Sequence, residues 1–123
     1  MYDLFEWSED ELFSKMVAHE DEHLFEAVCA RFSDREEVSV VRGRVPDSFE
    51  IAFPLKIAFA HIDMNNSIPE VAALVRIIAI LSPGGAVILD DYGWWGYSEQ
   101  KLALDPIIDA AGLSVLELPT GQG

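Results

Sequence analysis

The fold is decided by residues 56–93, KIAFAHIDMNNSIPEVAALVRIIAILSPGGAVILDDYG. Two short apolar segments, residues 56–64 and residues 86–89, flank a longer apolar segment at residues 67–81. The outer segments have the length of strands and the middle one has the length of a helix, so the pattern predicts strand–helix–strand. Apolar residues on both faces of the first strand are typical of parallel strands in a sheet covered on both sides. We therefore predict an α/β fold with right-handed crossovers.

Each predicted strand ends in aspartate. Asp63 lies at the end of the first strand, and Asp90 and Asp91 follow the second. In an open α/β sheet, ligands bind at the carboxyl ends of the strands. Three carboxylates at one such edge repel one another unless a positive group lies between them, and Mg²⁺ prefers oxygen ligands. The residues alone leave two interpretations open: a magnesium site, or turn residues that cap the following helices.

The N-terminal part of the chain is predicted to hold helix and one short strand. Residues 8–11, SEDE, match a capping box, and an apolar stripe with helical spacing follows as far as Phe32. The stripe is interrupted near His19, where the helix is expected to break in two. Residues 38–41 are short and β-branched, and they predict a strand closed by Gly43.

The C-terminal part is predicted to hold an aromatic loop, a helix and a last strand. The loop, residues 92–97 (YGWWGY), has three interpretations: a lid over a bound substrate, a subunit contact, or packing onto the core. Pro106 would break a single helix through this region, so a fresh helix is predicted with Asp105 as its cap, ending at Ala111. Residues 113–118 predict the last strand.

Composition excludes several classes of function. The chain has 123 residues, which predicts one domain over residues 1–123. A net charge of −14, from 22 acidic and 8 basic residues, argues against nucleic-acid binding. Cys29 is the single cysteine, so no internal disulfide forms and the reducing cytoplasm is the expected location. The longest apolar run contains Arg76 and is broken at Pro83, so no membrane span is predicted.

Two sets of histidines also require interpretation. His19-Glu20-Asp21-Glu22-His23 matches the H-E-x-x-H pattern of zinc hydrolases, in which two histidines share one helix face. Both intervening positions are acidic and no third-ligand motif follows, so a solvated polar patch is favoured and zinc hydrolysis is a distant alternative. His61, on an apolar strand, is either a hydrogen-bonded core residue or part of a site.

Several motifs together resemble one protein family. The stronger ones are His61-Ile62-Asp63, Leu81-Ser82-Pro83-Gly84-Gly85 and Asp90-Asp91-Tyr92-Gly93, and the weaker ones are Val41-Arg42-Gly43, Pro46-Asp47 and residues 116–123. In these pieces the chain resembles the macrocin O-methyltransferase (TylF/MycF-type) family, a branch of the class I S-adenosylmethionine-dependent methyltransferases. The resemblance covers residues 36–123, and more loosely residues 2–6.

The resemblance implies a function and a set of site residues. The function is S-adenosylmethionine-dependent, Mg²⁺-assisted methyl transfer to a hydroxyl of a small metabolite, often a sugar-containing one. A divalent ion bound to a hydroxyl lowers the pKa of that hydroxyl and orients its oxygen. The residues carried over are, as metal ligands, Asp63, Asp90 and Asp91; as catalytic residues, Asp63 and His61; and as cofactor contacts, Asp3, Gly43 and His61.

The resemblance also implies a Rossmann-like sheet in three layers, α/β/α, and this sequence departs from it at both ends. No glycine-rich turn precedes Asp3, so the first strand and its turn are expected to be missing. The family continues beyond residues 120–123 into a final strand, which is expected to be missing too. The strand that carries Asp63 would then have an open edge. The alternative function is therefore a non-catalytic remnant, an interaction module or homo-oligomer in which a second copy covers that edge.

Overall fold

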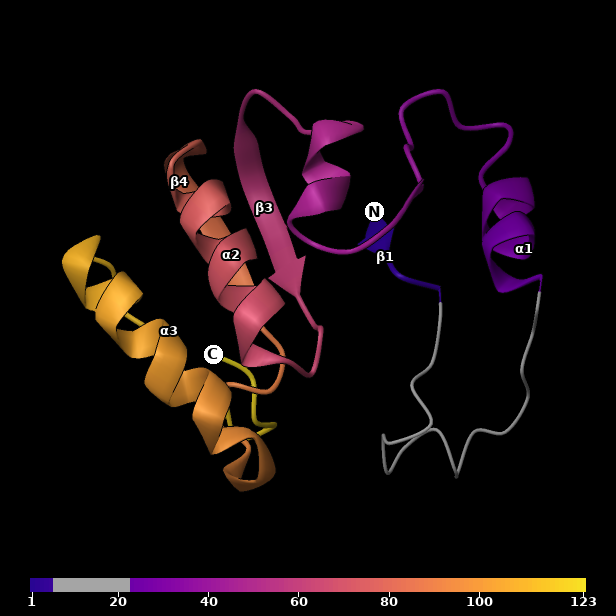
Figure 1. Cartoon of the computed structure of the whole chain (residues 1–123). Coiled ribbons are helices and arrows are strands. Elements are labelled where there is room, and N and C mark those ends of the chain that lie inside the picture. The colour runs from indigo at the N-terminus through magenta and orange to yellow at the C-terminus, as the bar shows by residue number, and fades with distance from the viewer. Residues whose placement is uncertain (6–22) are drawn as a thin grey trace. The chain divides into compact units, whose positions relative to one another are not determined.

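The computed structural model describes residues 1–5 and 23–123 (Figure 1). Contacts divide the chain into two compact units, Met1–Ala52 and Phe53–Gly123, and we describe each by itself. The helix predicted to begin at residues 8–11, and all of the H-E-x-x-H motif except its last histidine, lie outside the described residues. A single domain over the whole chain stays a prediction.

The first unit contains a pair of very short parallel strands. β1 (Tyr2–Asp3) pairs with β2 (Val41–Arg42), and the unit also contains α1 (Leu24–Arg31) and a short 3₁₀ helix, η1 (Asp47–Glu50). The strand predicted at residues 38–41 is confirmed only at its last residue. Pairing is limited to two residues on each strand, so the remaining β-branched residues have no partner strand within the described part of this unit.

Hydrogen bonds fasten the first residues of the chain onto this unit. The N-terminal ammonium of Met1 donates to the carbonyl of Ser39 at 2.7 Å, and the N–H of Val41 donates to the carbonyl of Met1 at 2.9 Å. The Tyr2 ring packs edge-on against Phe49, with ring centroids 5.0 Å apart. Together these contacts place β1 beside β2.

The strand–helix–strand unit predicted from residues 56–93 is confirmed. β3 (Ile57–Ile62) and β4 (Leu81–Leu89) are neighbouring parallel strands, and α2 (Ser67–Ile78) connects them. A parallel pair needs a crossover connection, which the long apolar helix supplies. The observed class is α/β.

The N-terminus of α2 differs by one residue from the prediction. Ser67 with Glu70 three residues later matches a capping box, which predicts Ser67 as the helix cap. The cap is instead Asn66, whose Oδ1 accepts a hydrogen bond from the Ile68 N–H at 3.0 Å. Asn66 has extended backbone angles, which a capping residue requires, and asparagine caps helices as well as serine does.

The start of β4 also differs. The sequence predicts a strand from Ala86, whereas β4 already begins at Leu81. Pairing shifts between Ile57, which lies beside Leu81, and Phe59, which lies beside Ala86, so the Pro-Gly-Gly segment becomes an irregularity within the strand. Gly84 has a φ of +78°, a backbone conformation that glycine adopts without strain.

The last helix corrects the prediction around Pro106. α3 (Ser98–Ala110) is continuous, with Pro106 inside it, so the predicted fresh start at Asp105 is wrong. The proline lacks an N–H and therefore removes one helical hydrogen bond. Leu104 and Ile108, on either side of it, are both buried, and their packing offsets that loss.

Residues 113–118 do not form the predicted last strand. A strand requires a neighbour along its length, and among the described residues this segment bonds to the following turn only around Leu118. The Leu118 N–H donates to the carbonyl of Gln122 at 2.8 Å, and the Leu118 carbonyl accepts from the Gly121 N–H at 3.0 Å. The segment therefore stays irregular despite its apolar residues.

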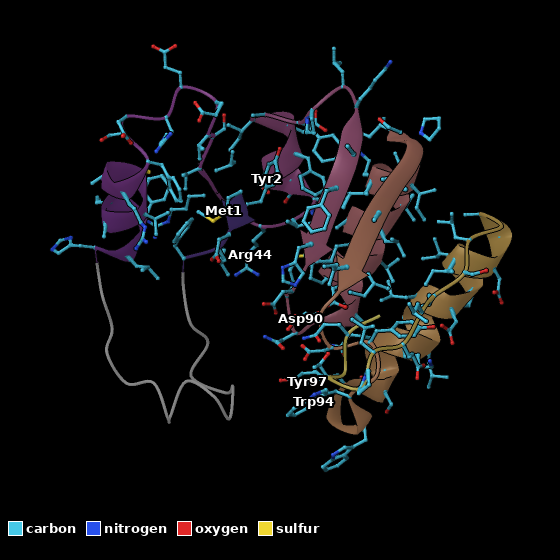
Figure 2. All side chains as sticks on the ribbon, turned by 180° about the vertical axis from the view of Figure 1, so that it is seen from behind. Met1, Tyr2, Arg44, Asp90, Trp94 and Tyr97 are labelled. Carbon is cyan, nitrogen blue, oxygen red and sulfur yellow. The ribbon has the colours of Figure 1, made fainter. Side chains whose placement is uncertain are left out.

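The core of the second unit lies between β3 and the two long helices. α2 packs against β3, and α3 packs against α2; Figure 2, seen from behind, shows both strands in front of α2. The opposite face of the sheet carries Phe59, which is 62% exposed, so the described residues of this unit contain one helical layer. The buried apolar side chains of the unit are Ile62, Ala73, Leu74, Ile77, Leu89, Tyr92, Leu104 and Ile108.

The single cysteine, Cys29, is a free thiol and is half-buried in α1. No helix in the part of the chain that the structure describes combines the length and apolar character needed to cross a membrane.

Candidate metal centre

The predicted site residues of the second unit lie where β3 and β4 end. Ile62 pairs with Leu89, and the ladder continues one step further because the Asp90 N–H donates to the carbonyl of Ile62 at 3.0 Å. Successive residues of a strand point to opposite faces of the sheet. His61, Asp63 and Asp90 therefore lie on the face opposite to Ile62 and Leu89, away from the core.

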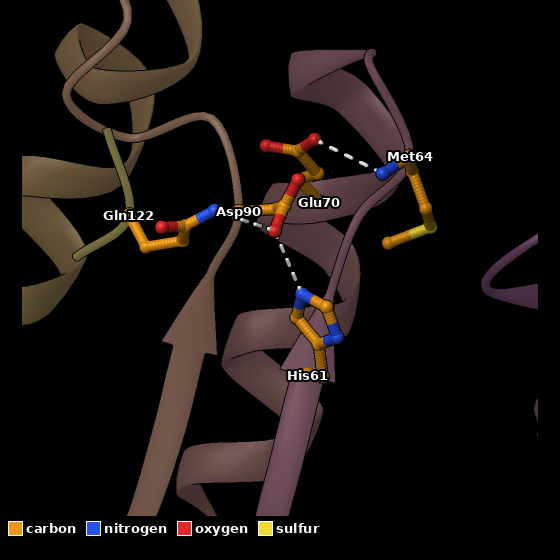
Figure 3. Close-up of polar contacts among 5 residues, drawn as sticks. All are labelled: His61, Met64, Glu70, Asp90 and Gln122. Carbon is orange, nitrogen blue, oxygen red and sulfur yellow. Dashed lines mark hydrogen bonds and ion pairs between the residues drawn. The ribbon is translucent and has the colours of Figure 1, made fainter. Parts of the chain in front are cut away.

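His61, Asp63 and Asp90 form a group that could hold a metal ion. Each offers one ligand atom, and these three atoms all lie within 4.8 Å of one another. Nε2 of His61 lies 3.1 Å from Oδ1 of Asp90 (Figure 3). His61 and Asp63 are exposed and Asp90 is partly exposed, so an ion can enter from solvent. The structure thus brings together two of the predicted metal ligands and adds an imidazole.

Asp91 is not part of the group of His61, Asp63 and Asp90, but the charges of Asp63 and Asp90 act on it. Burial raises the pKa of the Asp91 carboxyl, and the negative charges of Asp90 and Asp63 raise it further. Its predicted role as a metal ligand stays a prediction. The carboxylates of Asp63 and Asp90 thus add negative charge around Asp91, an arrangement that a bound cation would stabilise.

Gln122 is a residue of this site that the sequence interpretation did not assign. Its Nε2 donates to Oδ1 of Asp90 at 3.2 Å, so that one oxygen faces both Gln122 and His61 (Figure 3). The segment is held by two reciprocal bonds between Gly123 and Leu89, of 3.0 and 2.9 Å. Position in the sequence does not indicate this contact, because it depends on the chain returning to β4.

Glu70 was also not assigned from sequence. It lies in the first turn of α2, is only 5% exposed, and its Oε1 accepts the Met64 N–H at 3.4 Å (Figure 3). Burial raises the pKa of the Glu70 carboxyl, and the charge of Asp91 adds to this, whereas hydrogen bonds from the Met64 and Asn66 backbone oppose it. A hydrogen bond with the side chain of the buried Gln100 also lowers the pKa of Glu70. Glu70 thus supports the turn that carries Asp63.

Replacing Glu70 by glutamine should stabilise the protein at neutral pH. The folded state raises the pKa of Glu70 above its ordinary value of 4.5, so it binds the proton more tightly than the unfolded state does. Wild-type stability is therefore lost as pH rises from about 4.5 through the higher folded pKa. Glutamine can still accept the Met64 N–H without a charge. The stability difference, measured by urea unfolding, should be small at about pH 5 and larger at about pH 7.5.

Glu99→Gln is the matched control for this change. Glu99 is also in the first turn of its helix, α3, but is exposed. Both substitutions lose the favourable interaction of an acid with a helix N-terminus. Only for Glu70→Gln should the free energy of unfolding relative to wild type increase as pH rises. Equal pH profiles for the two variants would show that burial of Glu70 has no energetic effect.

Asp3 and Gly43, the predicted cofactor contacts, belong to the first unit. Oδ1 of Asp3 accepts the Phe5 N–H at 2.6 Å, and the Asp3 carbonyl accepts the Gly43 N–H at 3.0 Å. Gly43 has a φ of +145°, and a Cβ there would lie 3.2 Å from Cβ of Ser48. Local packing therefore accounts for the glycine, and its contact with a cofactor stays a prediction.

The aromatic loop is partly buried and partly exposed. Tyr92 is buried and its hydroxyl donates to Asp105, whereas Trp95, in η2 (Trp95–Tyr97), is 90% exposed. The Lys101 ammonium lies 4.0 Å from the centre of the Tyr92 ring and pairs with Glu117. Packing onto the core thus applies to Tyr92. For the exposed Trp95, a lid over a bound substrate and a subunit contact both stay predictions.

A separate cavity of about 450 Å³ lies between α3 and residues 113–117. Its lining includes Tyr92, Lys101, Asp105 and Glu117, and these polar groups contact one another. None of its lining residues belongs to the group of His61, Asp63 and Asp90. The metal group is therefore an open surface site rather than part of this cavity.

No family model, curated protein or solved structure matches this chain.

Proposed function

We propose that the chain belongs to the S-adenosylmethionine-dependent methyltransferases and assists transfer of a methyl group to a hydroxyl of a small metabolite, with a divalent metal ion at the ends of β3 and β4. The observation that carries this proposal is the convergence of His61, Asp63 and Asp90 at that edge. Ligands of open α/β sheets bind at such edges. The methyl-transfer chemistry comes from the resemblance of residues 36–123 to the macrocin O-methyltransferases.

The donor set fits a divalent cation. Carboxylate oxygens suit Mg²⁺, and a cation would neutralise the neighbouring charges of Asp63, Asp90 and Asp91. Asp63, Asp90 and Asp91 would hold Mg²⁺, which when bound supplies a Lewis acid for the substrate hydroxyl. Asp63 is the residue that we propose to accept the hydroxyl proton, and Nε2 of His61 lies 3.1 Å from Oδ1 of Asp90.

Among the residues that the resemblance assigns to the cofactor, Asp3 is the one that we propose to contact its ribose. Asp3 ends β1, a parallel strand, which is where a carboxylate can hydrogen-bond ribose hydroxyls of a nucleoside cofactor. S-adenosylmethionine, when bound, supplies the methyl group. The chain's own part in the reaction is to orient the substrate hydroxyl and to accept its proton.

Calorimetric titration with S-adenosylhomocysteine in the presence of Mg²⁺ tests this function. A dissociation constant of roughly 1–100 μM is expected for a working cofactor site. Asp3→Asn should weaken binding, and Asp34→Asn, at an exposed position of the same unit, should not. A folded sample that binds no S-adenosylhomocysteine would contradict the proposal.

A second candidate is a non-catalytic interaction module. Each described sheet has two strands, and among the described residues β3, the strand that leads to Asp63, pairs along its length with β4 alone. The other edge of such a strand is a template for pairing with another chain. A stable dimer by light scattering, together with no cofactor binding, would favour this candidate; a monomer would contradict the form of it in which a second copy covers the edge.

A further inference from the structure

We propose that His61 is itself a metal ligand, and that His61, Asp63 and Asp90 bind a divalent transition-metal ion such as Zn²⁺ through one imidazole nitrogen and two carboxylate oxygens. The inference rests on the metal site of the proposed function. It replaces the set of three aspartates with a mixed set, and it changes the ion that the site prefers.

The group brings its three ligand atoms within reach of one shared ion. Two ligands bound at about 2.1 Å to a tetrahedral ion lie about 3.4 Å apart. Nε2 of His61 and Oδ1 of Asp90 are 3.1 Å apart, and all three ligand atoms lie within 4.8 Å of one another, so rotation of the exposed Asp63 side chain would complete the group. A histidine–aspartate hydrogen bond would explain the first distance, but it does not require the Asp63 oxygen to converge on the same point.

The surroundings of His61 argue against a purely structural role. Its side chain is exposed, on the sheet face away from the core, so it is not a buried core histidine. Asp90 does not depend on it for a partner, because Gln122 already donates to the same oxygen at 3.2 Å. Carboxylates that bind metal ions commonly have such an outer hydrogen-bond donor.

The ligand types determine the ion. Imidazole suits Zn²⁺, Cu²⁺, Fe²⁺ and Ni²⁺, whereas Mg²⁺ takes oxygen ligands almost exclusively. Alternation along β3 accounts for the mixed set, since His61 and Asp63 are two residues apart and share a face. By the same rule Asp90, which continues the strand, faces them, and Asp91 does not.

The test compares Zn²⁺ with Mg²⁺ in matched variants. Nearly all sites with nitrogen and oxygen ligands bind Zn²⁺ more tightly than Mg²⁺, so the informative quantity is the effect of His61→Gln on each affinity. All titrations use a His19→Gln/His23→Gln background, which removes the other histidines of the chain and with them the H-E-x-x-H motif. Calorimetry gives both affinities, and ¹⁵N NMR of the His61 imidazole reports direct coordination.

We expect His61→Gln to weaken Zn²⁺ binding by at least about tenfold and Mg²⁺ binding by less than about twofold. Zn²⁺ should also shift the His61 Nε2 resonance. Equal losses for the two ions, without that shift, would show that His61 only positions Asp90 and would overturn the proposal. Loss of Zn²⁺ binding in the background variant alone would overturn it too. The titrations contain no S-adenosylhomocysteine, so their result is separate from the test of methyl transfer.

Discussion

Asp63→Asn and Asp90→Asn are each expected to lower the affinity for a divalent ion by at least about 100-fold, because changes to groups that merely support metal ligands already cost about 10–100-fold. Each substitution removes a negative charge and a strong oxygen donor while keeping the side-chain size. Calorimetric titration of the 123-residue chain with Mg²⁺ and Zn²⁺ measures the loss.

Asp109→Asn provides the matched control for these two variants. Asp109 is an exposed carboxylate near the end of α3 and is not part of the metal group. Its loss lowers the net negative charge by the same amount, so it measures the general electrostatic attraction of an acidic chain for cations. If all three variants lose the same small amount of affinity, there is no specific metal site at the strand ends.

Leu104→Ala is expected to destabilise the second unit by about 2–5 kcal/mol, the usual cost of emptying a buried leucine site. Leu104 is 1% exposed, on the face of α3 that packs against α2. Together with the packing of Ile108, its packing also offsets the missing hydrogen bond at Pro106. Urea unfolding followed by circular dichroism measures the change.

Leu102→Ala is the control on the same helix. Leu102 is 73% exposed, and its truncation should change stability by no more than about 0.5 kcal/mol. The two substitutions have the same effect on helix propensity, so their difference isolates packing. Similar losses at both positions would show that α3 does not pack as described.

The central part of the fold could be predicted because its signals are local. Strand–helix–strand follows from the length and hydrophobicity of the segments in residues 56–93, although β4 begins at Leu81 and not at the predicted Ala86. Local rules failed where packing between distant segments decided the outcome. Pro106 predicts a helix break, but buried neighbours keep α3 continuous. Residues 113–118 have strand-like composition, yet no described strand lies along them.

The candidate site was predictable to a similar degree. The aspartates after the two strands could be recognised, and the alternation of side chains along a strand is enough to put His61 and Asp63 on one face. Glu70 could not be recognised as part of the site, because its first-turn position is ordinary and its burial depends on how α2 and α3 pack. Gln122 lies far along the chain, and only the return of its segment to β4 reveals it.

The return of the C-terminal segment also governs where this protein can carry an affinity tag. Gly123 pairs with Leu89, and the neighbouring Gln122 side chain reaches Asp90. A polyhistidine tag joined to Gly123 would begin beside the metal group, where a short tether keeps its imidazoles at an effective concentration on the order of millimolar. Those imidazoles would compete for the ion under study. A cleavable tag is therefore needed before any affinity measured on this chain can be assigned to His61, Asp63 and Asp90.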